Sequence, residues 1–306
     1  MEWNGVFPAL TTKFNADDTL DLSLFNKNLD YQLECGVNGI ILGGSLGEAS
    51  VLTLNEKEIL VKNTVEKVGG RAPVILNIAE GATRDAISQA KLARKWGAAG
   101  LMLLPPMRYK SDYRETVGYF KSVASSTELP IVVYNNPVEY KNEVTLSMFQ
   151  DLQECENIQA VKESTRDVSN VTRMINLFGD RYKILCGVDT IAMEELLLGA
   201  HGWIAGLVCA FPAETVAIYN LIRDGKIEEA ARIYRWFMPL LEFDIHPKLV
   251  QYIKLAETQV GIGSEYVRLP RLTVIGKERE HVLAVIEHAL STKPALPSKS
   301  ISGVLK

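Results

Sequence analysis

The sequence has no apolar run that approaches the ~20 residues needed for a membrane-spanning helix. Its first residues also lack the basic region and apolar stretch that are typical of a secretory signal peptide. Cysteine is scarce: the chain has four cysteines and no CxxC pair, and its four histidines do not fall at metal-ligand spacing. We therefore expect a cytoplasmic protein with free thiols and no metal site.

Charge of one sign is not concentrated anywhere along the chain. The 33 basic and 37 acidic residues are interspersed and give a net charge of −4. A basic stripe would favour nucleic acid and a basic cluster would favour a lipid surface, and the sequence has neither. Hydrophobic residues make up 47% of the chain, which is too many for a disordered protein. We expect a folded protein that acts on a small, diffusible substrate, with no nucleic-acid or membrane partner.

The sequence does contain a regular alternation of short apolar runs and longer amphipathic segments. The apolar runs have the composition of strands that are buried on both faces: Val6–Thr11, Gly39–Gly43, Val74–Ile78, Leu101–Leu104, Ile131–Tyr134, Gln159–Lys162, Lys183–Cys186 and Trp203–Val208. Parallel strands need crossovers of the length seen here, so the pattern predicts an α/β fold, the (β/α)8 TIM barrel. A doubly wound open sheet is the main alternative, but no GxGxxG fingerprint follows the first run.

Capping residues support these boundaries. We expect helices to begin near Thr53, Thr83 and Ser169, and Glu56 follows Thr53 at the spacing of a capping box. We expect glycines to end helices at positions 36, 97 and 199, where a left-handed residue is favoured.

We expect three parts along the chain. Residues 1–222 would form the catalytic barrel, residues 223–291 a helical appendix packed on it, and residues 292–306 a loosely ordered tail. Helical spacing predicts three helices in the appendix, at Lys226–Glu242, Lys248–Val260 and Glu278–Leu290.

Lys162 ends the sixth apolar run, at the edge of the barrel where active sites of this fold lie. A lysine that points into a barrel loses hydration, so its neutral form is favoured and its pKa falls. The neutral amine is the nucleophile that forms a Schiff base with a ketone. Pairing of the lysine with a carboxylate such as Glu163 remains an alternative.

Two further features lie at the same edge of the barrel. Tyr134 ends the preceding run, and its phenol could move protons beside Lys162, although a core aromatic is equally consistent with the pattern. The glycine-rich segment Gly43–Glu48 follows the second run. Its backbone N–H groups and the Ser45 hydroxyl can hold a carboxylate, but a phosphate site or a plain tight turn fits as well.

Together, in this order, these motifs resemble the dihydrodipicolinate synthase/N-acetylneuraminate lyase family of class I lyases. The resemblance covers residues 5 to about 222 and rests on the segments GVFPALTT, GGSLGE, YNNP and VKES and on a glycine after the seventh run. It implies that Lys162 carries the imine and that Tyr134 moves protons at the carboxyl end of the substrate. It also implies that Ser45 and the amides around Gly44 and Leu46 bind the carboxylate of a 2-oxo acid.

The resemblance has further implications for the pocket and the assembly. The backbone carbonyls of Gly187 and Ile204 match family positions that line the pocket. Members of the family need no metal or organic cofactor, so we expect none here beyond the covalent imine on Lys162. They are commonly tetramers, and we expect a homotetramer.

Three positions depart from the synthases of this family. Leu46 stands where the synthases have the second threonine of a proton relay, and Met107 stands where they have the other relay tyrosine. Glu139 stands where an arginine receives the carboxylate of the second substrate. Because a relay needs all its members, these positions argue against synthase activity. Met107 and Glu139, with Asn136, Ser164 and Asp189, are the residues that we expect to contact the distal end of the substrate.

Details of the sequence at 104–110, 202–212 and 234–241 look most like one branch of the family. That branch includes 1-pyrroline-4-hydroxy-2-carboxylate deaminase and 2-keto-3-deoxy-pentonate dehydratase. The favoured hypothesis is dehydration and deamination of 1-pyrroline-4-hydroxy-2-carboxylate to 2,5-dioxopentanoate. The alternatives are an aldolase that releases pyruvate from a hydroxylated 2-oxo acid and a dihydrodipicolinate synthase. A non-catalytic binding protein or regulator with the same barrel is a further alternative, but the presence of Lys162 and Tyr134 argues against it.

Overall fold

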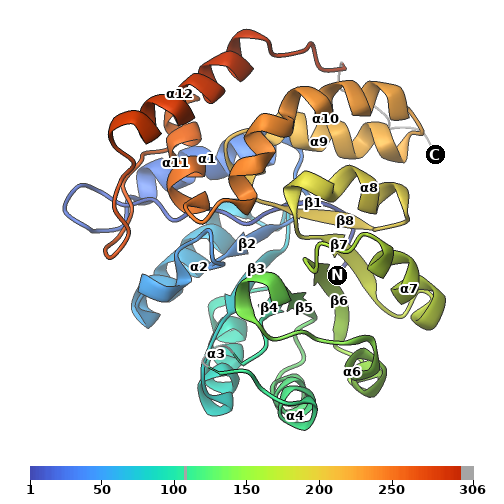
Figure 1. Ribbon diagram of the computed structural model, residues 1–306. Coiled ribbons are helices and arrows are strands. Elements are labelled where there is room, and N and C mark those ends of the chain that lie inside the picture. Colours follow the sequence, from blue (N-terminus) through green and yellow to red (C-terminus); the bar gives the residue numbers. More distant parts are fainter. Residues whose placement is uncertain (107–108, 298–306) are drawn as a thin grey trace.

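The computed structural model describes residues 1–106 and 109–297 of the chain (Figure 1). Among them, eight parallel strands form a (β/α)8 TIM barrel, which confirms the predicted fold class. The strands are β1 (Gly5–Pro8), β2 (Ile40–Leu42), β3 (Val74–Ile78), β4 (Gly100–Leu103), β5 (Ile131–Asn135), β6 (Ile158–Glu163), β7 (Lys183–Cys186) and β8 (Gly202–Ala205). From β2 to β8, each strand pairs with the next strand in sequence, and β8 pairs with β1. A single bridge between Ala9 and Ile41 joins the two remaining edges.

Twelve α-helices surround the described barrel or follow it: α1 (Leu22–Cys35), α2 (Leu54–Val68), α3 (Thr83–Trp96), α4 (Tyr113–Ala124), α5 (Pro137–Tyr140), α6 (Leu146–Asp151), α7 (Ser169–Phe178), α8 (Ala192–Leu197), α9 (Pro212–Arg223), α10 (Ile227–Leu241), α11 (Leu249–Gln259) and α12 (Gly276–Ser291). Short 3-10 turns are η1 (Ala49–Val51), η2 (Leu152–Glu154), η3 (Asp189–Ile191), η4 (Leu207–Cys209) and η5 (Glu242–Ile245). No helix of the described residues has both the length and the apolar character to span a membrane.

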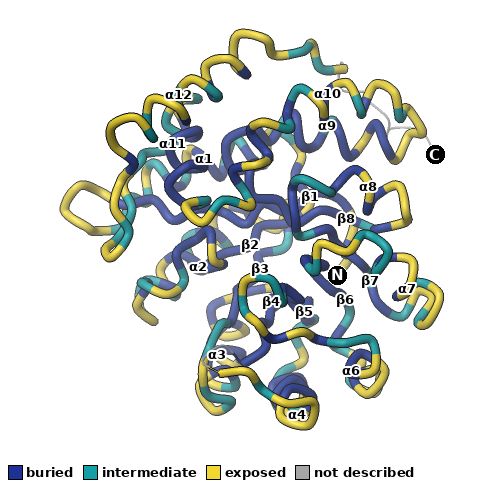
Figure 2. The backbone as a smooth tube through the Cα atoms, in the orientation of Figure 1, coloured by how far each residue is buried: buried dark blue, intermediate teal, exposed yellow. Residues whose placement is uncertain are grey.

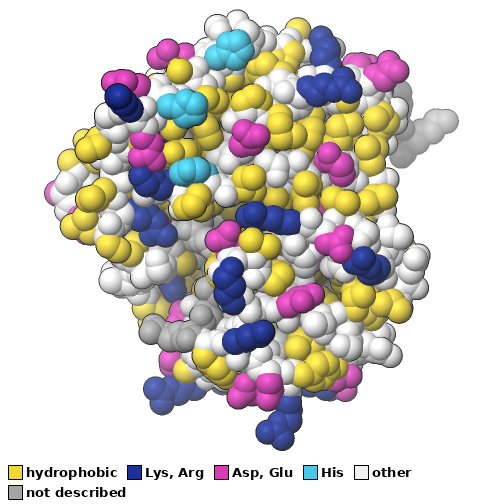
Figure 3. Space-filling model, in the orientation of Figure 1, with side chains coloured by type: hydrophobic (Ala, Val, Ile, Leu, Met, Phe, Trp, Pro, Cys, Tyr) yellow, Lys and Arg dark blue, Asp and Glu magenta, His cyan; other side chains and the backbone are white. Residues whose placement is uncertain are grey.

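Two apolar layers form the core. Side chains on the inner face of the strands, including Phe7, Ile75 and Leu185, fill the barrel. Side chains on the outer face pack against the surrounding helices. Figure 2 shows the result: the strands are buried, while the outer helices are exposed on the side that faces away from the barrel. On the face drawn in Figure 3, basic and acidic side chains lie mixed among hydrophobic ones.

The predicted strand positions agree with the structure, and the predicted caps agree only in part. Thr53 begins α2 with a complete capping box, because its hydroxyl accepts from the Glu56 amide and the Glu56 carboxylate accepts from the Thr53 amide. Thr83 and Ser169 are not caps. Each is the first residue of its helix, and the residues before them, Ala82 and Val168, make no side-chain cap hydrogen bond.

The glycines predicted to end helices have the expected backbone. Gly36 and Gly97 have φ values of 88° and 95° at the ends of α1 and α3, and Gly199 has a φ of 106° just after α8. Glycine adopts these angles without the steric cost that a Cβ atom would impose.

Helices α10, α11 and α12 correspond to the three predicted appendix helices. Helix α10 packs on α9, and α12 packs on both α10 and α11. They lie over the β1 side of the barrel (Figure 1). The division of the chain into a barrel, an appendix and a tail stays a prediction. Residues 298–306 of the expected tail lie outside the described residues.

A buried ion pair joins the appendix to the barrel. Lys13, which follows β1, lies 2.8 Å from Glu257 on α11, and neither side chain is exposed to solvent. Glu257 also accepts hydrogen bonds from the Thr11 hydroxyl (2.6 Å) and the Asn28 amide (3.1 Å). Breaking such a pair leaves a buried charge without its partner, which is more costly than removing both charges together.

Lys13→Met should therefore lower the free energy of unfolding by about 3–5 kcal/mol. The double variant Lys13→Met, Glu257→Leu should lose less, because no unpaired charge stays in the interior. Urea unfolding of the wild type and both variants measures the difference. Equal losses in the single and double variants would contradict this account of the ion pair.

Candidate active site

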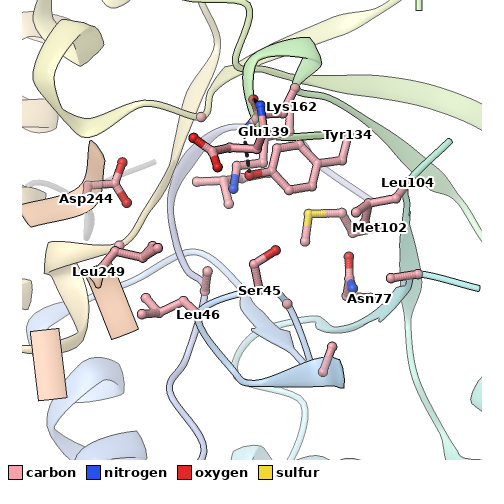
Figure 4. A pocket seen from close by; sticks show the side chains of 18 of the residues that line it. Ser45, Leu46, Asn77, Met102, Leu104, Tyr134, Glu139, Lys162, Asp244 and Leu249 are labelled. Atoms are coloured by element: carbon pink, nitrogen blue, oxygen red, sulfur yellow. Dashed lines mark hydrogen bonds between the residues drawn. The ribbon is translucent and has the colours of Figure 1, made fainter. Parts of the chain in front are cut away.

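A pocket of about 330 Å³ opens at the carboxyl-terminal ends of the strands (Figure 4). Tyr134 at the end of β5, Lys162 at the end of β6 and Ile204 on β8 line it, as does the glycine-rich loop after β2. Residues of η5 and of the segment after it, between α10 and α11, complete the wall. The pocket is thus built from the barrel and from the chain that follows it.

Lys162 is buried, and its Nζ lies 4.0 Å from the centre of the Tyr134 ring. The two residues are register partners on neighbouring parallel strands, which explains why their side chains enter the pocket together. Burial lowers the pKa of Lys162, although the nearby carboxyl group of Asp244 partly opposes this effect. The lowered pKa favours the neutral amine that a Schiff base requires.

The alternative in which Glu163 holds Lys162 is wrong. Successive residues of a strand point to opposite faces, so the Glu163 carboxylate lies away from the pocket. It accepts hydrogen bonds from the Thr165 backbone and the Asn170 side chain, each at 2.8 Å.

Tyr134 lies among three other polar groups. Its hydroxyl accepts a hydrogen bond of 3.3 Å from the Asn136 amide, and its ring packs edge to face on Tyr140, with 5.6 Å between the ring centres. The Tyr140 hydroxyl is hydrogen-bonded to the Ser45 hydroxyl. Burial raises the pKa of Tyr134 to about 12, so the phenol keeps its proton at neutral pH and can donate it.

Sequence reasoning missed Tyr140. Asn136 caps α5, where its side chain accepts from the Glu139 amide at 3.1 Å, and Pro137 fixes the first helical position. The single helical turn after this cap brings Tyr140 back over Tyr134. An Asn-Pro pair closely followed by a tyrosine was the only signal of this arrangement.

The glycine-rich loop presents Gly44, Ser45 and Leu46 to the pocket. Two hydrogen bonds close the loop, from the Glu48 amide to the Ser45 carbonyl (3.1 Å) and from the Ala49 amide to the Gly44 carbonyl (3.2 Å). The buried Glu48 carboxylate is ion-paired with Lys254 of α11. The loop is thereby fixed at both its backbone and its last side chain.

Of the residues that we expected at the distal end of the substrate, Asn136 and Glu139 line the pocket. Gly187 and Ile204 line it as well. Glu139 lies 3.4 Å from Arg166, which also lines the pocket and was not predicted. Met107 lies outside the described residues.

Ser164 and Asp189 are not among the residues that line the pocket, and their predicted contact with substrate stays a prediction. Ser164 lies beneath Gly187, where a Cβ atom would stand 2.1 Å from the Ser164 hydroxyl. Gly187 is thus required at this position by close packing. Asp189 uses its carboxylate to accept from Trp203 (2.8 Å) and from the backbone of Gly206 and Leu207.

Asp244 is a second residue that sequence reasoning missed as part of the pocket. It lies on η5, lines the pocket, and accepts a hydrogen bond of 3.1 Å from the Asp189 amide. Burial raises the pKa of Asp244, and burial together with the neighbouring Asp244 raises the pKa of Asp189 to about 8. No cluster of His, Cys, Asp or Glu among the described residues is arranged to hold a metal ion.

A buried lysine with a lowered pKa, beside a tyrosine at the mouth of a (β/α)8 barrel, defines a lyase of the class I aldolase type. The model of the dihydrodipicolinate synthetase family matches residues 2–289, and the chain belongs to that family. It is 30% identical to the 4-hydroxy-tetrahydrodipicolinate synthase of Exiguobacterium sibiricum, over 92% of this chain and 96% of the relative. It is 27% identical to the synthase of Moorella thermoacetica, over 94% and 98% of the two chains.

Solved structures agree with this assignment. A monomeric dihydrodipicolinate synthase variant superimposes with a TM-score of 0.89 at 26% identity, over 94% of this chain and 97% of that one. The Aquifex aeolicus synthase also gives 0.89 at 26% identity, over 93% and 97% of the two chains. The expected family is confirmed, while the deaminase branch within it is not distinguished by these relatives.

Incubation with pyruvate and borohydride at neutral pH should alkylate Lys162, because its lowered pKa keeps amine available where exposed lysines are protonated. Peptide mass spectrometry locates the label. Lys162→Ala should abolish it. Lys57→Ala is the matched control, since Lys57 lines the same pocket in an ion pair with Glu80. Labelling that persists in Lys162→Ala would show that Lys162 is not the nucleophile.

Tyr140→Phe should slow exchange of the pyruvate methyl protons with deuterated water by about 10-fold or more, because it removes the hydroxyl between Ser45 and Tyr134. Borohydride labelling of Lys162 should persist. Tyr113→Phe, whose hydroxyl binds Ser147 and Asp151 away from the pocket, serves as the control. Exchange at the wild-type rate in Tyr140→Phe would exclude the hydroxyl chain from proton transfer.

Proposed function

We propose that Lys162 forms a Schiff base with a 2-oxo acid or its cyclic imine, and that the chain converts 1-pyrroline-4-hydroxy-2-carboxylate to 2,5-dioxopentanoate. The desolvated amino group over the Tyr134 ring supports the Schiff base. The position of Glu139 supports the choice of substrate. Where the resemblance implies an arginine for a second carboxylate, the pocket has a carboxylate instead.

Each residue of the pocket has a part in this reaction. The Ser45 loop holds the substrate carboxylate, and the ring imine is transferred to Lys162, which opens the ring and frees an amine on carbon 5. Tyr134, with Tyr140 and Ser45 behind it, carries the proton that leaves carbon 3. The hydroxyl on carbon 4 then leaves as water. One hydrogen from carbon 5 and one from its amine then move to carbons 3 and 4, which turns the amine into an imine. Two molecules of water hydrolyse the imines at carbon 5 and at Lys162, so the net reaction consumes one water and releases ammonia.

The apolar lining fits a short substrate. Leu46, Met102 and Leu104 form part of the wall and are buried. Leu46 cannot carry a proton. The Tyr140 hydroxyl, however, is hydrogen-bonded to the hydroxyls of both Ser45 and Tyr134, and this chain does not need Leu46. We propose that the reaction uses no metal or organic cofactor, since the imine itself accepts the electron pair from carbon 3.

A second candidate is 4-hydroxy-tetrahydrodipicolinate synthase. The names of the curated relatives favour it over the deaminase. Two observations in the pocket agree with it. Tyr140 supplies a relay hydroxyl from the same chain, and Arg166 brings a cation within 3.4 Å of Glu139, near the position of the missing arginine. Both candidates share the imine on Lys162 and differ in the steps after it forms.

The predicted homotetramer also stays a proposal, since one of the most similar structures is a monomeric variant. The predicted cytoplasmic location likewise stays a proposal.

Three incubations of the purified chain separate the candidates. With 1-pyrroline-4-hydroxy-2-carboxylate, the deaminase should release ammonia and 2,5-dioxopentanoate in equal amounts, and Lys162→Ala should release neither. With pyruvate and aspartate semialdehyde, a synthase should consume both. With a hydroxylated 2-oxo acid, an aldolase should release pyruvate. Consumption of pyruvate and the semialdehyde without ammonia release in the first incubation would overturn the deaminase in favour of the synthase.

A further inference from the structure

Asp244 comes from outside the barrel strands. It lies on η5, between α10 and α11, and reaches the pocket only because these helices pack against the barrel mouth. Its side chain is partly accessible, and in Figure 4 its carboxyl group points into the pocket toward the side where Lys162 lies. Asp244 has no part in the steps carried out by Ser45, Lys162 and Tyr134.

The proposed reaction needs an acid that the barrel strands do not supply. A hydroxyl group is a poor leaving group and departs readily only when it receives a proton. Tyr134 and Ser45 lie on the side of the pocket that handles the substrate carboxylate and carbon 3. The donor must therefore lie farther along the substrate, beyond the carbon joined to Lys162.

We propose that Asp244 donates the proton that lets the hydroxyl on carbon 4 leave as water, an inference that rests on the proposed function. The electron pair left on carbon 3 first forms the bond between carbons 2 and 3, and the Lys162 nitrogen becomes neutral. This pair then forms the bond between carbons 3 and 4 as the bond from carbon 4 to oxygen breaks. The oxygen takes the Asp244 proton and departs as water, and the Asp244 carboxylate regains a proton from solvent.

The surroundings of Asp244 suit this role. Asp189 on η3, Lys162 on β6, Arg166 after β6 and Glu139 on α5 are the charged groups that interact with it. Burial raises its pKa, so Asp244 keeps a proton at a higher pH than an ordinary aspartic acid. The Asp189 amide, Lys162 and Arg166 favour the ionised form of Asp244, but burial is the largest effect and the net shift of the Asp244 pKa is upward.

Neither of the other two acids fits as the donor. Asp189 does not line the pocket, and its two oxygens accept hydrogen bonds from Trp203, Gly206 and Leu207. Glu139 is exposed and is ion-paired with Arg166. Asp244 alone among these carboxyl groups combines access to the pocket with an environment that retains the proton.

The test compares two leaving groups in Asp244→Asn. Ammonia release from 1-pyrroline-4-hydroxy-2-carboxylate should fall by about 100-fold or more, the range for loss of a general acid. Ammonia release from the 4-chloro analogue should keep most of its wild-type rate, because chloride leaves without a proton. Borohydride labelling of Lys162 with pyruvate should also persist. Glu242→Gln, an exposed carboxylate two residues away, is the matched control and should leave all three measurements unchanged.

Each other outcome is informative. A parallel loss with both leaving groups would assign Asp244 a structural role and overturn the inference, as would full activity of Asp244→Asn on the hydroxyl substrate. In both cases the wild type still releases ammonia, so the proposed function stands. A wild-type chain that releases no ammonia from either substrate overturns the proposed function, and the role of Asp244 with it.

Discussion

The rest of the site depends on the removal of one amino group from water. Lys162 is a nucleophile only if its neutral form is favoured, and burial at the carboxyl-terminal end of the filled barrel provides this. The same packing constrains its neighbours. Gly187 must lack a side chain, since a Cβ atom there would collide with Lys162 and Ser164. Tyr134, its register partner, then forms the floor against which the amine rests. The chemistry of the pocket is thus a consequence of how tightly the strand ends are packed.

The segment after the barrel contributes to the site at two separate points. Lys254 of α11 is ion-paired with Glu48, which fixes the end of the loop that presents Ser45. The η5 turn places Asp244 in the pocket. Both contacts are buried or partly buried, where electrostatic interactions are stronger than at the surface. Loosening the appendix would therefore disturb both the glycine-rich loop and the distal end of the pocket, although no appendix residue forms part of a barrel strand.

Much of the fold and the positions of Lys162 and Tyr134 could be predicted from the sequence, because both follow from local patterns. The runs 74–78 and 183–186 are strands over their whole predicted lengths, and Lys162 and Tyr134 follow from the rule that active sites lie at strand ends. Tyr140 and Asp244 could not be predicted in this way. The position of Tyr140 depends on the direction of a single helical turn, and that of Asp244 depends on how helices pack over the barrel mouth. The hydrogen bonds of Asp189 could not be predicted for the same reason: its position at a strand end is a local property, but the backbone that occupies its oxygens comes from the loop of the next strand.

The identity to named synthases, 26–30% over nearly the whole chain, is compatible with more than one reaction. The synthase and the deaminase both begin with an imine on a buried lysine and removal of a proton from carbon 3, and barrel packing preserves that step. They diverge afterwards, because the synthase adds the resulting enamine to an anionic aldehyde and the deaminase expels a hydroxyl group.

An anionic aldehyde needs a pocket wall of net positive charge, whereas a leaving hydroxyl group needs a proton. In this pocket the distal arginine, Arg166, is already paired with Glu139, and Asp244 is held in surroundings that favour its protonated form. This distal wall supports the proposed elimination, while the imine on Lys162 is common to both reactions.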